Sequence, residues 1–239
     1  MNILKLFPDN KVIVLPQSIY YEPTDSGNLK KKNAIRNYHK HPNLYFIARE
    51  QNTYNLLKNE LMAGKDGCFA LTPDIALYLK YESLGNRNKI LWCLRHDGEK
   101  NNNSNVIVKH IKYLLDKHEF SHEYTDTYVN YSIPIENEEK EVCLKLQEFS
   151  KARLVITDRL HGMIYAAISG TPVIAMDNST GKVGNIYGLW LQSIPHIRYV
   201  CDKQSAGLAV YDLLNIQDNQ YNQAEFVPKY KPIINAINA

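Results

Sequence analysis

The segment ARLVITDRLHGMIYAAISGTPVIAMDNSTGKVGNIYG, residues 152–188, decides the fold. LVIT (154–157) is a short run of apolar and β-branched residues, which is typical of a buried strand. Residues 160–170 repeat apolar side chains at the spacing of a buried helix face, and PVIAM (172–176) follows as a second strand. A strand, a helix and a second strand in this order predict a parallel β-α-β unit.

The same alternation extends outward from this unit in both directions. Toward the C-terminus we expect a helix at 183–193, a strand at 197–200 and a helix at 204–215. Toward the N-terminus we expect strands at 90–95 and 122–129 and helices at 105–118 and 136–150. Farther upstream we expect strands at 11–17, 44–50 and 68–74 and helices at 27–40 and 52–64. The chain is therefore predicted to have an α/β fold built on parallel sheets.

A polar run, ESLGNRNK, marks the predicted boundary between two halves of the chain. We expect a Rossmann-like N-terminal half at 1–86 and a Rossmann-like C-terminal half at 87–217. The tail, 218–239, is expected to pack back toward the first half.

Composition narrows the class of protein. The chain has 239 residues and a net charge of +3, which is sufficient length for a real core but not the charge of a dedicated nucleic-acid binder. Charged residues and prolines interrupt its N-terminal apolar run, so we expect no signal peptide or membrane span and a cytoplasmic protein. Cys68, Cys93 and Cys201 are in or beside expected strands, which predicts buried thiols and no metal site.

Asp158, Arg159 and His161 stand where the strand at 154–157 passes into the next helix. In an open parallel sheet, ligands bind at the carboxyl ends of the strands, and a helix N-terminus there attracts anions. Arg159 supplies a fork of donors suited to phosphate or carboxylate, and His161 supplies a proton near neutral pH. Asp158 or Thr157 is the expected helix cap. An Arg–Asp pair beside a helix-capping histidine is the alternative.

Two further strand ends carry polar side chains. Arg95 follows one strand, and Asn178, Ser179 and Lys182 follow another, in a loop that contains a glycine. Arg95, Arg159 and Lys182 are predicted to converge on one strongly anionic small ligand. A solvated surface arginine and lysine are the alternative for the outer two positions. The sequence has no GxGxxG or P-loop motif, which disfavours ordinary dinucleotide binding and ATP hydrolysis.

These residues resemble the polysaccharide pyruvyl transferase family. VITDRLHGMIYAAISGTPVIAMDNSTGKV is similar to that family's most distinctive segment, and VIVLPQSIYYE, FIARE, LTPDIALYL and WCLRHDGEK are similar to its other blocks, in the same order. The resemblance implies two Rossmann-like halves of the glycosyltransferase-B type. It also implies phosphoenolpyruvate as donor substrate and a sugar unit of a bacterial capsule or exopolysaccharide as acceptor, with a pyruvate ketal as product.

The resemblance also implies roles for individual residues. Arg159, Leu160 and His161 match the family's functional Arg-Leu-His triplet, and Arg95 matches a second functional position. Both arginines would hold the phosphate or carboxylate of phosphoenolpyruvate, and His161 would donate a proton or bind the donor. This route needs no metal and no cofactor.

Family members usually begin with a longer segment that carries a glycine-rich HGGGN loop. Here the chain starts at Met1, shortly before the first strand, so we expect an N-terminally short member with an incomplete first half. A second copy or a partner chain would then supply the missing part. The acceptor is a sugar or a lipid-linked oligosaccharide, and peripheral association with a membrane is one alternative location. The competing functions are a nucleotide-sugar-dependent glycosyltransferase of the same architecture and an inactive, truncated remnant.

Overall fold

The computed structural model describes residues 3–81, 87–98, 101, 104–216 and 220–238. The chain forms two compact units. Unit 1 comprises residues 1–78 and 224–239, so the tail belongs with the first sheet, and unit 2 comprises residues 79–223. The division comes before the polar run, because the backbone N–H of Tyr81 donates to the carbonyl of Ile168 in unit 2 at 3.2 Å.

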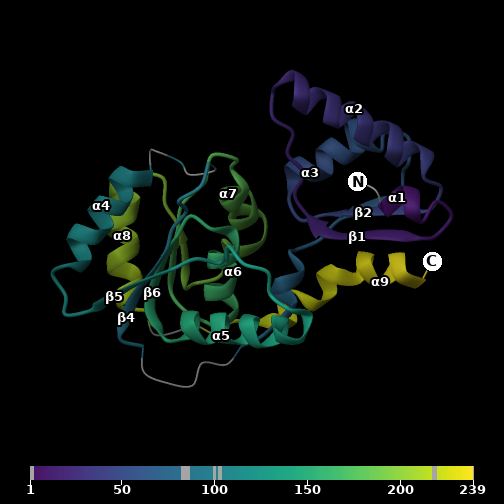
Figure 1. Cartoon of the computed structure of the whole chain (residues 1–239). Helices are drawn as coiled ribbons and strands as arrows, with labels where there is room; N and C mark the ends of the chain where they lie inside the picture. The colour runs from purple at the N-terminus through teal and green to yellow at the C-terminus, as the bar shows by residue number, and fades with distance from the viewer. Residues whose placement is uncertain (1–2, 82–86, 99–100, 102–103, 217–219, 239) are drawn as a thin grey trace. The chain divides into compact units, whose positions relative to one another are not determined.

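Unit 1 is a three-stranded parallel sheet with strand order β1-β2-β3. The strands are β1 (Val12–Gln17), β2 (Leu44–Ala48) and β3 (Phe69–Leu71). The helices are α1 (Ile3–Leu6), α2 (Asp25–Lys40), α3 (Gln51–Leu56) and α9 (Lys231–Asn238). Figure 1 shows α2 and α3 on one face of this sheet and α9 on the other. Apolar strand residues such as Phe46 are therefore enclosed, which explains their near-continuous hydrophobic pattern.

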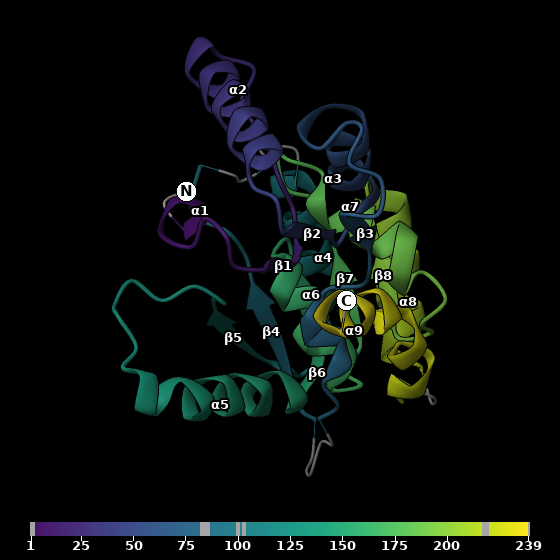
Figure 2. The ribbon, with the colours of Figure 1, turned by 90° about the vertical axis from the view of Figure 1, so that its right-hand side faces the viewer.

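Unit 2 is a five-stranded parallel sheet with strand order β5-β4-β6-β7-β8. The strands are β4 (Lys89–Cys93), β5 (Ser121–Thr125), β6 (Ala152–Thr157), β7 (Val173–Ala175) and β8 (Ile197–Tyr199). The helices are α4 (Ser104–Leu115), α5 (Glu138–Ser150), α6 (Leu160–Ile168), α7 (Lys182–Ile186) and α8 (Lys203–Leu214). In Figures 1 and 2, α4 and α8 cover one face of the sheet, and α5, α6 and α7 cover the other.

This topology creates a switch point between β4 and β6. From β4 the chain crosses through α4 to β5 on one side, and it later returns through α5 to β6 on the other side. In doubly wound sheets the crevice outside such a reversal, at the carboxyl ends of the strands, is the usual ligand position. The predicted α/β class with Rossmann-like, parallel-sheet units is confirmed.

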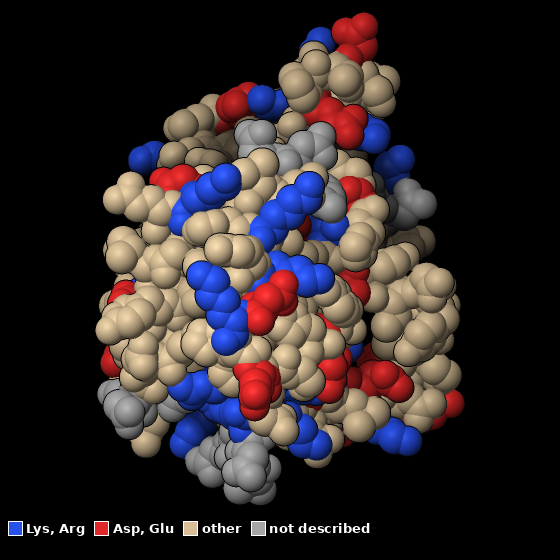
Figure 3. Space-filling model, turned by 90° about the vertical axis from the view of Figure 1, so that its left-hand side faces the viewer, with Lys and Arg blue, Asp and Glu red and all other residues tan. Residues whose placement is uncertain are grey.

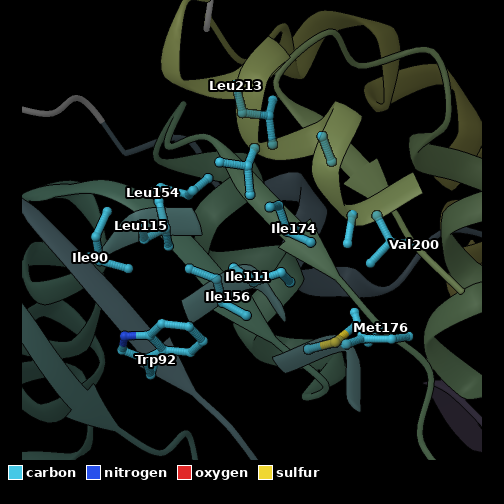
Figure 4. Packing of buried hydrophobic residues seen from close by; sticks show 14 residues of the cluster. Ile90, Trp92, Ile111, Leu115, Leu154, Ile156, Ile174, Met176, Val200 and Leu213 are labelled. Carbon is cyan, nitrogen blue, oxygen red and sulfur yellow. The ribbon is translucent and has the colours of Figure 1, made fainter. Parts of the chain in front are cut away.

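The core of unit 2 follows from the alternation of side chains along each strand. Ile90 and Trp92 of β4 and Leu154 and Ile156 of β6 face α4 and α8, as Figure 4 shows. The intervening residues, such as Cys93, face the opposite layer. Each of these side chains is at most 2% exposed, so the strands are held from both sides.

Two local expectations are wrong. The strand expected at 122–129 ends at Thr125, and Asp126 begins a segment that extends away from the sheet before α5 (Figure 2). The helix expected at 183–193 is present, as α7 followed directly by a wider π-helical turn at 187–191. Cys201 is exposed rather than buried, because it lies in the turn between β8 and α8.

The surface of unit 2 carries both signs of charge. Figure 3 shows lysine and arginine side chains on a largely uncharged face, with acidic side chains among them. One ion pair in this unit joins Arg198 of β8 to Asp212 of α8 at 3.8 Å. Among the residues that the structure describes, no helix is long and apolar enough to cross a membrane.

Candidate functional site

The candidate site lies at the switch point of unit 2. Cys93 of β4 and Thr157 of β6 are register partners, so the chain leaves both strands at the same edge of the sheet. Arg95 follows β4 by two residues, and Arg159 follows β6 by two residues. Parallel pairing therefore brings together two arginines that are 64 positions apart in the sequence.

Asp158 joins the two strand ends. Its Oδ1 accepts the backbone N–H of Arg95 at 2.7 Å, and its residue is only 1% exposed. Burial raises the pKa of Asp158, although the N–H of Arg95 and the charges of Arg95 and Arg159 oppose that shift. Asp158 is therefore not the helix cap: Arg159 occupies the cap position of α6, in an extended conformation.

The start of α6 packs against β4 and β6 through Gly162. A Cβ atom at this position would lie 2.4 Å from Oγ1 of Thr157 and 3.1 Å from Sγ of Cys93. Oγ1 of Thr157 donates to the carbonyl of Cys93 at 2.8 Å and accepts the N–H of Arg159 at 3.0 Å. The glycine thus allows the helix to approach closely, and the threonine fixes the backbone from which the arginine projects.

Two carboxylates hold the arginines. Asp97 accepts from Nε of Arg95 at 2.8 Å and from Nη2 at 3.1 Å, and its Oδ2 also accepts from Nη1 of Arg159 at 2.8 Å. Asp126 accepts from Nη2 of Arg159 at 2.6 Å. Arg159 therefore forms ion pairs with Asp97 and Asp126, rather than the pair with Asp158 that was the alternative interpretation of the sequence. Arg95 and Arg159 lie close enough to share one anionic group.

Burial alone would lower the pKa of Arg159, but its hydrogen bonds and charge interactions with Asp126 and Asp97 raise that pKa further than burial lowers it. The guanidinium is therefore firmly cationic. Its Nε is buried and has no hydrogen-bond partner among the residues that the structure describes. A buried donor left in this state costs free energy, which an incoming oxygen atom would recover.

The other two residues of the triplet lie in the first turn of α6. His161 is exposed, and its ring lies 6.1 Å from that of Tyr165. Leu160 is 7% exposed, so its side chain contributes packing and only its backbone is polar. The first N–H groups of a helix have no partner within the helix, so they favour an anion at this place.

The loop after β7 is organised by Asn178. Its Oδ1 accepts from the N–H and Oγ1 of Thr180 and from the N–H of Lys182 at 3.3 Å. Gly181 adopts a left-handed conformation, with φ of 71°, immediately before α7. Asn178 is thus a buried support for this loop, whereas Ser179 is exposed. The convergence of Lys182 on the arginines remains a prediction, although β7 is the neighbour of β6.

Sequence reasoning missed Asp126 and Tyr199. The strand expected at 122–129 would have placed Asp126 within the sheet, where its side chain would not have met Arg159. Tyr199 ends β8 and donates to Oδ2 of Asp177 at 3.1 Å. Burial and the Asp177 carboxylate both raise the pKa of Tyr199, so its hydroxyl stays protonated. The signal that could have identified these two residues is the polar residue that stands at or just after each strand end of the sheet.

Unit 1 has a polar cluster at the carboxyl edge of its own sheet. Arg49, which follows β2, donates to Oγ of Ser18 at 3.0 Å and to Oδ2 of Asp74 at 2.6 Å. Glu50 is buried and caps α3 by accepting the N–H groups of Asn52 and Thr53. These polar groups lie at the carboxyl edge of the unit 1 sheet, as Arg95 and Arg159 lie at the carboxyl edge of the unit 2 sheet.

Comparisons with known proteins identify the family of this chain. The family model described as polysaccharide pyruvyl transferase matches residues 1–180. General stress protein 30 of Bacillus subtilis is 32% identical over 97% of this chain, and Pyruvyl transferase 1 of Schizosaccharomyces pombe is 26% identical over 79%. The chain spans 66% of the first relative and 49% of the second.

A solved structure of UDP-GlcNAc 2-epimerase from Methanocaldococcus jannaschii shares the fold. It is 15% identical and superposes with a TM-score of 0.53, covering 95% of this chain and 70% of the epimerase. This likeness concerns architecture alone. The family model, which matches three quarters of the chain, shows that the protein belongs to the polysaccharide pyruvyl transferase family.

Proposed function

We propose that this protein transfers a pyruvyl group from phosphoenolpyruvate to a sugar unit of a bacterial surface polysaccharide and forms a pyruvate ketal. The observation that carries the proposal is the carboxylate of Asp97, which bridges Arg95 and Arg159 at the switch point. A cationic pair that already holds one carboxylate is suited to a small ligand with a carboxylate and a phosphate.

The residues have complementary tasks in this reaction. Arg95 and Arg159 bind the donor's acidic groups, with the N–H groups of the first turn of α6 beside them. His161 donates a proton to the methylene carbon of phosphoenolpyruvate, which makes the central carbon cationic. One sugar hydroxyl attacks that carbon and loses its proton. Phosphate leaves with the electrons of its C–O bond, and a second hydroxyl closes the ketal and loses its proton.

The acceptor is a sugar or lipid-linked oligosaccharide whose two hydroxyls are close enough to form one ring with the ketal carbon. We assign the acceptor side to unit 1, where Arg49 and Ser18 offer polar groups at the strand ends. Phosphoenolpyruvate is a substrate in this scheme, and the chemistry uses no bound cofactor.

The test is a calorimetric titration of the purified chain with phosphoenolpyruvate. Wild type should bind, and Arg159→Lys should lose at least about tenfold in affinity, because a lysine cannot bridge to two acidic groups as the planar fork does. Arg153→Lys is the matched control: Arg153 is on the same strand at its opposite end, where Nη2 donates to the carbonyl of Leu214. This control should bind like wild type.

Titrations with nucleotide sugars distinguish the proposed pyruvyl transferase from the competing glycosyltransferase. Binding of a nucleotide sugar without binding of phosphoenolpyruvate would favour a glycosyltransferase and overturn the proposal. Binding of phosphoenolpyruvate that Arg159→Lys leaves intact would move the donor site elsewhere.

A further inference from the structure

The proposed chemistry uses two arginines and a histidine but leaves Asp97 and Asp126 without a task. Both carboxylates contact the guanidinium that is meant to bind an anion, at 2.8 and 2.6 Å from its nitrogens. A ligand with acidic groups cannot occupy the same donors while both carboxylates remain in place. The free protein therefore holds the site in a state that competes with its own ligand.

The two carboxylates differ in exposure and in their hydrogen-bond partners. The Asp126 side chain is 27% exposed, and its Oδ1 also accepts the N–H of Tyr128 at 3.0 Å, which fixes it in a turn. The Asp97 side chain is 45% exposed and stands in the loop after β4. An exposed carboxylate regains water when it leaves its partners, which offsets part of the free-energy cost of releasing Asp97 from the two arginines.

Asp97 also matches the ligand in shape. Its two oxygens bind both arginines at once, with Oδ2 shared between Nη2 of Arg95 and Nη1 of Arg159. Within the described part of the chain the buried Nε of Arg159 has no hydrogen-bond partner, so this arrangement leaves one donor unused. A ligand with two acidic groups would satisfy both guanidinium groups and this remaining donor.

We propose that Asp97 is an internal counter-anion that occupies the donor site of the free protein and is displaced by a ligand carrying two acidic groups. This inference rests on the proposed function and specifies the ligand charge that the site requires. Asp126 is a positioning residue that keeps Arg159 in place after the exchange. A monoanion would replace one negative charge by another with little gain, whereas a phosphate and a carboxylate together bring additional charge to the pair.

The experiment compares anion binding by wild type with that of Asp97→Asn. Inorganic phosphate, phosphoenolpyruvate and pyruvate serve as probes in calorimetric titrations and in thermal unfolding of the full chain. Asp97→Asn should bind phosphate and phosphoenolpyruvate about three- to tenfold more tightly, because the ligand no longer displaces a charge. Binding of pyruvate, weak or undetectable in wild type, should increase as well.

Three further variants complete the experiment, and one of them is a charge-matched control. Asp116→Asn changes the net charge equally at a side chain 55% exposed near the amino ends of the strands, so it should leave anion binding unchanged. Asp126→Asn should weaken binding of phosphoenolpyruvate, because the guanidinium of Arg159 loses its fixed partner. Asp97→Ser removes the same charge with a smaller side chain and serves if Asp97→Asn does not fold.

Weaker binding in Asp97→Asn and Asp97→Ser, or binding no tighter than in Asp116→Asn, would overturn the counter-anion role. Failure of the proposed function has a different signature. In that case neither wild type nor any variant binds phosphoenolpyruvate, yet phosphate still stabilises Asp97→Asn against heat more than it stabilises wild type. Absence of any anion effect on wild type and on both Asp97 variants would overturn both ideas.

Discussion

Replacing Gly162 with alanine tests whether close packing of α6 against the sheet sets the geometry of the site. The new Cβ would lie 2.4 Å from Oγ1 of Thr157, about 1 Å inside ordinary van der Waals contact. Thr157 is fully buried, and its hydroxyl is engaged by the carbonyl of Cys93 and the N–H of Arg159. The side chain therefore has no free space into which to move without breaking these hydrogen bonds.

The magnitude follows from opposing contributions. Overpacking a well-filled core costs about 1–3 kcal/mol, and a disrupted hydrogen bond adds about 1 kcal/mol. Alanine recovers up to about 1 kcal/mol from its higher helix propensity than glycine. Gly162→Ala should therefore lower the free energy of unfolding of unit 2 by about 2 kcal/mol. Displacement of the Arg159 backbone should also weaken binding of phosphoenolpyruvate.

The assay is urea unfolding followed by tryptophan fluorescence. Both tryptophans of the chain, Trp92 and Trp190, are in unit 2, so the signal reports that unit. Gly207→Ala is the matched control, because Gly207 lies within α8 and its Cβ would meet nothing closer than 3.8 Å. This control should gain up to about 1 kcal/mol. Equal stability of Gly162→Ala and Gly207→Ala would refute the reasoning.

Three further outcomes are expected. Asp158→Asn should flatten the pH dependence of the free energy of unfolding measured in urea. The pKa of Asp158 is raised from 3.8 on folding. Its contribution to stability is therefore complete below pH 3.8 and is lost as the pH rises through the raised pKa. His161→Gln should leave stability within about 0.5 kcal/mol of wild type, since the ring is exposed, yet lower ketal formation by about 100-fold or more in an assay of phosphate release. Arg49→Met should destabilise unit 1 by about 3 kcal/mol in circular dichroism melts, because the Asp74 side chain is only 4% exposed and would lose the charge of Arg49. The double variant Arg49→Met with Asp74→Asn should recover part of that lost stability.

Local sequence patterns were sufficient for much of unit 2. The β-branched strand at 154–157, the apolar face of 160–168 and the apolar run at 173–175 each depend on neighbours within a few residues. The placement of Arg95 and Arg159 past strand ends followed from the same periodicity. Because parallel strands end at one edge of a sheet, this pattern already predicted that the two arginines meet.

Only the tertiary structure decided which acidic residues meet Arg159. Asp158 is the sequence neighbour of Arg159, yet its side chain turns to the N–H of Arg95, because β4 pairs directly with β6. Asp126, 33 positions away from Arg159, reaches its guanidinium because β5 ends earlier than its sequence indicated. Strand order and strand ends depend on pairing between distant segments, and local periodicity carries no information about that pairing. The sequence by itself therefore determined the strands, the helices and the cationic residues of the site, whereas long-range packing determined the carboxylates that hold Arg159.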